Sequence, residues 1–143
     1  MKINDAKREM LYFKESQVWR VLLETVFGLR AMHKMGVMHR DIKSANIFLF
    51  TPQTQEASEI NSQSQTDLLQ QAKLGDMNVS KVSKQGMNRT QTGTPYYASP
   101  EVWRDEPYSF KSDIWSLGVV IYEMTSLIPP FQAKDMQELF KKV

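Results

Sequence analysis

Large apolar side chains recur at helical spacing over residues 18–35. They share one face of the predicted helix, at Val18, Leu22, Val26, Leu29 and Met32. Ser16 is suited to the N-cap of this helix, Lys34 to its last turn, and Gly36 to the left-handed residue that follows its end. The mixed polar residues 1–15 either extend the helix or form a loop.

After this helix the pattern changes to that of short strands. The run "IFLF" at 47–50 predicts one strand, and "AKLGDMN" at 72–78 predicts a second strand and a turn. Between them, residues 51–71 are rich in Gln, Ser and Thr and too poor in large apolar groups to offset the entropy of ordering. We therefore expect a β-hairpin with a flexible insert at 51–71.

Three further helices are predicted downstream. Their start signals are Ser99 followed by Pro100, then Ser112 or Asp113, and finally Asp135 with Glu138 as a capping box. The second of these helices, "IWSLGVVIYEMTSL", is apolar nearly all round and is predicted to be buried, and Pro129 and Pro130 stop it. The chain is thus predicted to be mainly helical with one small hairpin.

Composition places the chain among soluble globular proteins. Of its 143 residues, 41% are hydrophobic, which suits a single modest core. A formal net charge of +2 is too small to indicate binding to nucleic acid or to an anionic membrane. Cysteine is absent, and no signal peptide or membrane-spanning stretch is recognisable. We expect an intracellular protein.

Polar residues able to handle phosphate flank the predicted hairpin. Asp41, Lys43 and Asn46 lie at the start of its first strand, and Asp76 follows its second strand. Asn46 and Asp76 offer the hard oxygen ligands that Mg²⁺ prefers. Asp41 could accept a hydrogen bond from an attacking hydroxyl, and Lys43 could contact a phosphoryl oxygen. Each residue alone is more often an ordinary turn residue, so only the ordered set indicates phosphoryl transfer.

The ordered motifs resemble those of the eukaryotic protein kinases. "HRDIKSAN" fits H-R-D-x-x-x-x-N at each fixed position, and "GDMN", "GTPYYASPE" and "SDIWSLG" follow in order. The longer stretches "HRDIKSANIFL", "KLGDMNVSKV" and "KSDIWSLGVVIYEM" resemble the NIMA-related (Nek) Ser/Thr kinases. The resemblance covers nearly all of the chain except the insert. It implies the C-terminal lobe of the kinase-like α+β fold, from the region of helix E to that of helix G.

The resemblance also implies a role for each motif residue. Asp41 would act as catalytic base, and Lys43 would contact the γ-phosphate of ATP. Asn46 would bind one Mg²⁺, and Asp76 would bind Mg²⁺ that bridges the β- and γ-phosphates. The implied reaction is transfer of the γ-phosphoryl group from Mg-ATP to Ser or Thr hydroxyls of protein substrates, with no nucleic acid or membrane as partner. A location in the cytoplasm or on the cytoskeleton is implied as well.

Further residues would support this site by resemblance. Thr94 would contact the catalytic pair and shape the pocket for the residue after the acceptor. Asp113 would bond the backbone around His39 and Arg40, with His39 in a structural role. Glu101 would pair with an arginine farther along than residue 143.

Arg40 beside the catalytic Asp suggests control by phosphorylation of the segment 76–101. A phosphate adds nearly two negative charges and can dock on such an arginine. By the spacing of the family, Thr90 is the first candidate phosphosite and Thr92 the second.

Half of the expected catalytic equipment is missing. No two of the six glycines are two residues apart, so a G-x-G-x-x-G loop is impossible, and the Lys of kinase strand β3 is absent too. We therefore expect residues 1–143 to form a partial kinase domain without the N-terminal ATP lobe and the last helices, inactive by itself. An incomplete gene model, a split gene or an artificial truncation would explain this. We also expect the helix around Trp115 and Val119 to lose packing partners and expose apolar surface.

Two other classes of function compete with the kinase. The truncated lobe could be a non-catalytic binding module or pseudokinase fragment that docks partners, which the missing lobe favours. A metal-dependent hydrolase built on Asp41, Asn46 and Asp76 would leave "GTPYYASPE" unexplained. The four intact motif residues favour the kinase, because a docking role needs none of them.

Overall fold

The computed structural model describes residues 3–9, 11–50, 71–76 and 96–143. Its elements are α1 (Ile3–Glu9), α2 (Glu15–Lys34), the 3₁₀ helix η1 (Ser44–Asn46), β1 (Ile47–Phe50), β2 (Gln71–Leu74), α5 (Pro100–Trp103), α6 (Phe110–Ser126) and α7 (Met136–Lys142). The described residues are thus mainly helical with one hairpin, as predicted. Of the predicted insert 51–71, only Gln71 is described, as the first residue of β2.

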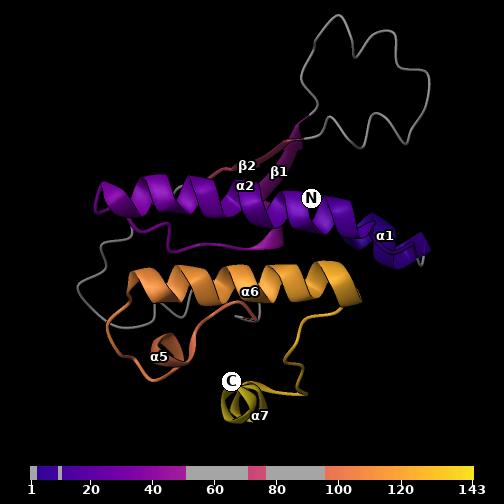
Figure 1. Ribbon diagram of the computed structural model, residues 1–143. Helices are drawn as coiled ribbons and strands as arrows, with labels where there is room; N and C mark the ends of the chain where they lie inside the picture. Colours follow the sequence, from indigo (N-terminus) through magenta and orange to yellow (C-terminus); the bar gives the residue numbers. More distant parts are fainter. Residues whose placement is uncertain (1–2, 10, 51–70, 77–95) are drawn as a thin grey trace, which may run out of the picture.

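Helices α2 and α6 form the centre of the molecule. They lie side by side and run in opposite directions, the β1–β2 hairpin passes behind α2 and packs against it, and α5 and α7 lie below α6 (Figure 1). The core between these layers is apolar and comes from α1, both central helices, the loop before η1 and the hairpin: Ile3, Val21, Leu29, Ile42, Ile47, Ala72, Leu117, Val120 and Met124.

Helix α2 confirms the long helix that the apolar pattern predicts, but its start differs. Lys14 is the N-cap, and its backbone N–H donates to Gln17 Oε1 at 2.9 Å. The prediction of Ser16 as N-cap is wrong, because Ser16 already lies in the first turn. The end agrees with the sequence: Gly36 follows the helix with φ 75°, a conformation that glycine adopts without steric cost. Helix α1 lies in a stretch for which the sequence left helix and loop open.

Helix α6 also starts earlier than predicted. Ser109 is the N-cap, and its Oγ accepts from Lys111 N at 3.2 Å. The prediction of Ser112 or Asp113 as N-cap is wrong, since both lie buried in the first turn. The last residue of the helix is Ser126, and its C-cap Leu127 has a left-handed φ of 62°. The helix therefore stops before Pro129.

The two strands pair antiparallel in the register Ile47 to Leu74 and Phe50 to Gln71, which confirms the predicted hairpin. Gly75 follows β2 and donates its N–H to Asn46 O at 2.9 Å. A Cβ at this glycine would lie 2.6 Å from a ring carbon of Phe48. The Phe48 ring packs directly against the backbone of Gly75, and a side chain at residue 75 would displace the ring.

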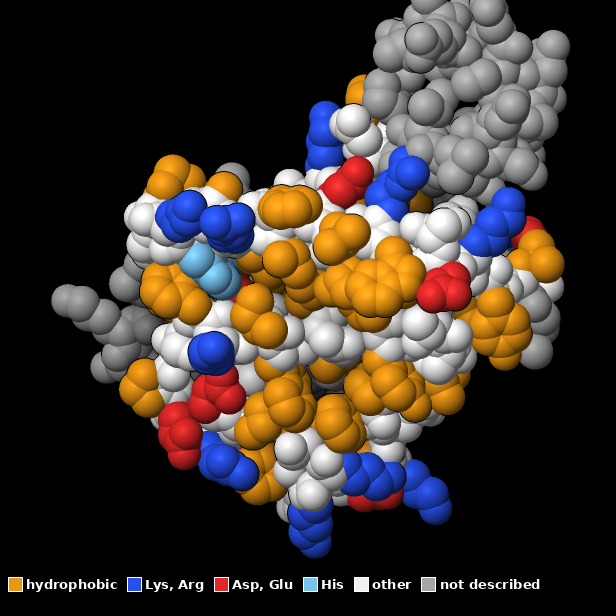
Figure 2. Space-filling view, viewed as in Figure 1, with side chains coloured by type: hydrophobic (Ala, Val, Ile, Leu, Met, Phe, Trp, Pro, Cys, Tyr) orange, Lys and Arg blue, Asp and Glu red, His pale blue; other side chains and the backbone are white. Residues whose placement is uncertain are grey.

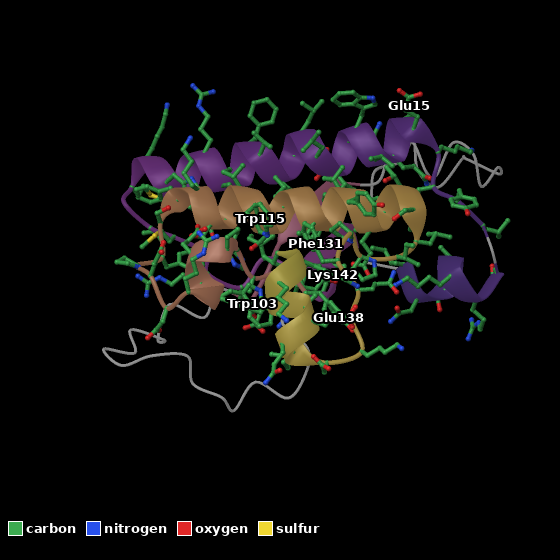
Figure 3. All side chains as sticks on the ribbon, turned by 90° about the horizontal axis from the view of Figure 1, so that it is seen from below. Glu15, Trp103, Trp115, Phe131, Glu138 and Lys142 are labelled. Carbon is green, nitrogen blue, oxygen red and sulfur yellow. The ribbon has the colours of Figure 1, made fainter. Side chains whose placement is uncertain are left out.

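Aromatic contacts attach α7 and the loop before it to the rest of the molecule. Trp115 of α6 stacks on Phe131, with ring centroids 5.8 Å apart and planes 5° apart (Figure 3), and Trp103 of α5 contacts Phe140 of α7. Val119 is only 4% exposed. Ile114 and Tyr122 of the same helix are 47% and 48% exposed, so the expected exposed apolar surface is present on α6, although Val119 itself is buried. Helix α7 begins at the predicted N-cap Asp135, which accepts from Glu138 N at 2.8 Å.

Exposed apolar side chains also gather along the outer face of α2. Trp19, Leu23 and Phe27, spaced four residues apart, are 54%, 49% and 61% exposed. Figure 2 shows hydrophobic side chains over α2 and, below it, over α6 and α7. Among the residues that the structure describes, no helix has the length and apolar character that crossing a bilayer requires.

Candidate active site

The loop between α2 and β1 brings Asp41, Lys43 and Asn46 together. Lys43 Nζ donates to Asp41 Oδ2 at 2.9 Å, and Asn46 Nδ2 donates to the same oxygen at 3.0 Å and to the Asp41 carbonyl at 2.9 Å. The Asp41 side chain is 14% exposed. Two donors on one carboxylate oxygen fix the orientation of the carboxylate.

The 3₁₀ helix η1 holds Asn46 in this position. Asn46 is buried and is the last residue of η1, and its backbone N–H donates to Lys43 O at 3.0 Å. The chain then enters β1 directly, so the same residue joins the hairpin and the loop. This local path explains why a motif of eight residues is enough to assemble three of the predicted site residues.

Asp76 reaches the site through the hairpin. It follows Gly75, which pairs with Asn46 across the ladder, and it is exposed with a φ of 53°. Within the described residues, no hydrogen bond joins its side chain to Asp41, Lys43 or Asn46. The Asp76 backbone is thus held beside the cluster through Gly75, whereas its side chain makes no hydrogen bond to these three residues.

The donor set fits a magnesium ion. Because the Nδ2 group of Asn46 is bonded to Asp41, a cation would meet the amide oxygen of Asn46 and the carboxylate of the exposed Asp76. Mg²⁺ usually binds one or two protein carboxylates and keeps several waters. In the described part of the chain no three His, Cys, Asp or Glu side chains cluster as metal ligands, so a cage made of protein ligands alone is not found there.

Asp113 supports the catalytic loop from α6. Its side chain is fully buried, and its two oxygens accept from the backbone N–H groups of His39 at 3.0 Å and Arg40 at 2.9 Å. Arg40 has a φ of 66°, which a non-glycine residue adopts only when its surroundings hold it there. Asp113 supplies that hold, as predicted, and it thereby fixes the backbone next to Asp41.

Two further groups bind Asp113 that the sequence did not indicate. His33 Nε2 lies 2.8 Å from Oδ2, and the Tyr108 hydroxyl donates to Oδ1 at 2.8 Å. Burial, together with the nearby Asp113 carboxylate, raises the pKa of Tyr108, so its hydroxyl stays protonated and donates. His33 is 80 positions away from Asp113, and no local pattern could have connected them.

Of the other predicted support residues, the structure describes His39 and Glu101 but not Thr94. His39 is buried, with its Nδ1 3.4 Å from the Asp41 backbone nitrogen. Glu101 accepts a hydrogen bond from Ser112 Oγ, and its pairing with a more distant arginine stays a prediction. Burial raises the pKa of Glu101, but the Ser112 hydroxyl and backbone donors outweigh it, so the pKa is lowered overall. Thr90, Thr92 and Thr94 lie outside the described residues.

Phe48 is a candidate that sequence reasoning treated only as part of a strand. Its side chain is 52% exposed, and its ring lies against Gly75, the residue before Asp76. An exposed aromatic ring beside phosphate-handling groups is a surface on which a nucleotide base could lie. The available signal was the apolar residue at an outward-facing position of β1, two residues after Asn46.

Comparison with known proteins agrees with this geometry. The family profile described as "Protein kinase domain" matches residues 1–143. The human Serine/threonine-protein kinase Nek5 is 38% identical over 133 residues, which is 92% of this chain and 16% of that protein. Mouse Nek4 is 34% identical over 99% of the chain and 16% of its own length. The probable Serine/threonine-protein kinase nek2 of Dictyostelium discoideum is 37% identical over 99% of the chain and 31% of its own length.

Proposed function

Because the chain belongs to the protein kinase family, and within it to the NIMA-related kinases, we propose that it carries the catalytic loop of a protein Ser/Thr kinase. The proposed reaction is transfer of the γ-phosphoryl group of ATP to a serine or threonine hydroxyl in a protein substrate. The chain spans 16% of the length of two of these relatives and 31% of the third, so the activity is proposed for the larger protein.

The arrangement around Asp41 carries the proposal. Lys43 and Asn46 both bond to Oδ2, which leaves Oδ1 to accept a hydrogen bond from the substrate hydroxyl. A base that is fixed in this way can orient the hydroxyl toward the phosphate and take its proton. Lys43 is 35% exposed, so its charge is also within reach of a phosphoryl oxygen. The hydrogen bonds from His39 N and Arg40 N to Asp113 hold the strained backbone beside this base in place.

ATP and Mg²⁺ are the proposed cofactors. Asn46 and Asp76 would hold the cation, and Phe48 would offer an apolar face to the base of the nucleotide. A bound Mg²⁺ neutralises charge on the phosphates during transfer. The chain's own contribution is to present these groups at one end of the hairpin, where the Gly75–Asn46 backbone bond keeps them adjacent.

We propose that the described residues form part of the C-terminal lobe. The sequence holds no glycine-rich phosphate loop, so the nucleotide-binding lobe would come from outside these 143 residues. We further propose that residues 51–71 are an insert in the kinase domain. Phosphorylation of Thr90 or Thr92 would regulate the activity, and the protein would act inside the cell.

A binding module is the second candidate function. The exposed row of Trp19, Leu23 and Phe27 on α2 favours it, because an apolar stripe of this kind is more usual at an interaction surface than in contact with water. On this alternative Asp41, Lys43 and Asn46 would be present but would not catalyse phosphate transfer.

The test is phosphate transfer by the full-length protein, with Mg-ATP and a generic Ser/Thr protein substrate. Asp41→Asn keeps the shape of the side chain and removes the base, and it should lower kcat by about 10²- to 10⁴-fold. Asp105→Asn is the matched control, because Asp105 is exposed with a φ of 58° that asparagine also tolerates. An inactive wild-type protein, or equal rates for Asp41→Asn and the control, would favour the binding module.

A further inference from the structure

Four polar side chains from four separate segments form one hydrogen-bonded chain. Lys7 Nζ of α1 lies 3.0 Å from Glu123 Oε1 of α6. The Tyr97 hydroxyl, from the segment before α5, donates to Glu123 Oε2 at 2.6 Å. Ser44, the first residue of η1, has its Oγ 2.9 Å from the Tyr97 hydroxyl. The chain therefore runs from the first helix of the molecule to the catalytic loop.

The chemistry of the groups fixes the direction of these bonds. An ionised carboxylate only accepts, and the Tyr97 hydroxyl has a single hydrogen, which it gives to Glu123. Ser44 must then donate to Tyr97. Burial and the bond to Glu123 raise the pKa of Tyr97 to about 12, so the hydroxyl stays protonated at neutral pH. The Tyr97 carbonyl also accepts from Ser116 Oγ at 2.7 Å, which holds the residue at a second point.

Lys7 is the cation that pairs with the Glu123 carboxylate. The Glu123 side chain is 8% exposed and that of Lys7 is 33% exposed, so the carboxylate is nearly buried while its cation still reaches solvent. A nearly buried carboxylate without a cation tends to take up a proton or to move toward water. If the carboxylate took up a proton, it could donate to Tyr97 and reverse the hydrogen bonds, and if it moved away, Tyr97 would lose its acceptor. In both cases the bond between Tyr97 and Ser44 would lose the fixed direction that the carboxylate gives it.

The far end of the chain bears on the catalytic cluster. Ser44 starts η1 and Asn46 ends it, and Asn46 in turn orients Asp41 through two hydrogen bonds. A loosened Ser44 would loosen this single turn, which is held by the bond from Asn46 N to Lys43 O. The Asp41 carboxylate would then lose its fixed orientation.

We propose that Lys7 is a positioning residue for the catalytic loop and that it acts through Glu123, Tyr97 and Ser44. Its effect on phosphate transfer rests on the proposed function, whereas its effect on the geometry of the loop does not. Helix α1 would thus set how well the loop is ordered, although it contributes no group to the reacting atoms.

The experiment compares Lys7→Met, Lys7→Arg and the control Arg8→Met in the full-length protein. Arg8 is the next residue of the same helix and is 75% exposed, with only surface ion pairs. Hydrogen–deuterium exchange of the peptide that contains residues 43–47 should be faster by about three- to tenfold in Lys7→Met, the factor expected for the loss of one ordinary hydrogen bond. Lys7→Arg, which keeps the cation, should stay close to wild type, as should Arg8→Met.

Two more readouts separate positioning from a general loss of stability. Ser44→Ala should speed exchange as Lys7→Met does, and the double variant should add little, because both break one chain. In phosphate transfer, kcat should fall by the same factor while the KM for ATP stays unchanged. If wild type transfers no phosphate but Lys7→Met still speeds exchange, the proposed function fails and the positioning role stands. If Lys7→Met exchanges like Arg8→Met, the inference is overturned whatever the activity.

Discussion

The buried carboxylate of Asp113 is the group whose loss should disturb the catalytic loop most. Its Oδ2 accepts from His39 N and faces His33 Nε2, and its Oδ1 accepts from Arg40 N and the Tyr108 hydroxyl. Asp113→Ala leaves these donors without their acceptor, at a cost of about 1–3 kcal/mol for each one that water cannot reach. Water can reach the half-buried donors, so we expect a total loss of about 3–5 kcal/mol in the free energy of unfolding.

Asp113→Asn provides a graded test of the same reasoning. Since each oxygen faces two groups, neither orientation of the amide satisfies all of them. One orientation directs Nδ2 at His33, whose ring nitrogen can accept, and leaves the His39 N–H facing a donor. The other directs Nδ2 at Tyr108, whose hydroxyl can accept, and leaves the Arg40 N–H facing a donor. We therefore expect a loss of about 2 kcal/mol, roughly that of one unsatisfied buried group.

The measurement is urea unfolding followed by fluorescence of Trp103 and Trp115, with Asp105→Asn as the control. Total stabilities of domains are about 5–15 kcal/mol, so both losses should shift the midpoint clearly. The expected order of stability is control, then Asp113→Asn, then Asp113→Ala. If Asp113→Ala unfolds within about 1 kcal/mol of the control, water must replace the four bonds at little cost, and Asp113 does not hold the loop.

Two further predictions concern single contacts. Tyr97 has its pKa raised from 10.0 to about 12 in the folded protein, so its contribution to stability is complete below pH 10 and is lost as the pH rises through 12. The urea midpoint of wild type should fall over this window and that of Tyr97→Phe should fall less, although Tyr108 shifts in the same direction in both; equal slopes would contradict the assignment. Gly75→Ala places a Cβ 2.6 Å from the Phe48 ring and should cost about 1 kcal/mol by displacing this half-exposed ring. A Phe48→Ala background should remove that cost, and an unchanged cost would mean that the contact with the ring is not its source.

Local sequence signals predicted the elements that depend on local physics. The helical spacing of apolar residues gave α2, the short apolar run gave β1, and Gly36 gave the left-handed end of α2. The motif "HRDIKSAN" gave Asp41, Lys43 and Asn46 together, because one loop and a single 3₁₀ turn bring groups so close in sequence into contact. For such groups the chain itself limits the distance, and the sequence is nearly sufficient.

The N-cap of α6 shows where this reasoning fails. Ser112 and Asp113 both have cap chemistry, but Ser112 donates to Glu101 and Asp113 binds the catalytic loop. With both side chains engaged in tertiary contacts, Ser109 caps the helix instead. A cap contributes about 1 kcal/mol, less than a buried charged group with four hydrogen-bond partners, so the tertiary contacts decide.

By itself, then, the sequence determined the family, the main elements and the cluster of Asp41, Lys43 and Asn46. Only the tertiary structure decided what holds that cluster: His33 and Tyr108 on Asp113, and the chain from Lys7 through Glu123 and Tyr97 to Ser44. Apart from Tyr108, which is five positions from Asp113, these partners are distant in sequence, up to the 116 positions between Lys7 and Glu123. Hydrogen bonds act over about 3 Å, so no pattern along the chain can show which distant groups folding will bring within that reach.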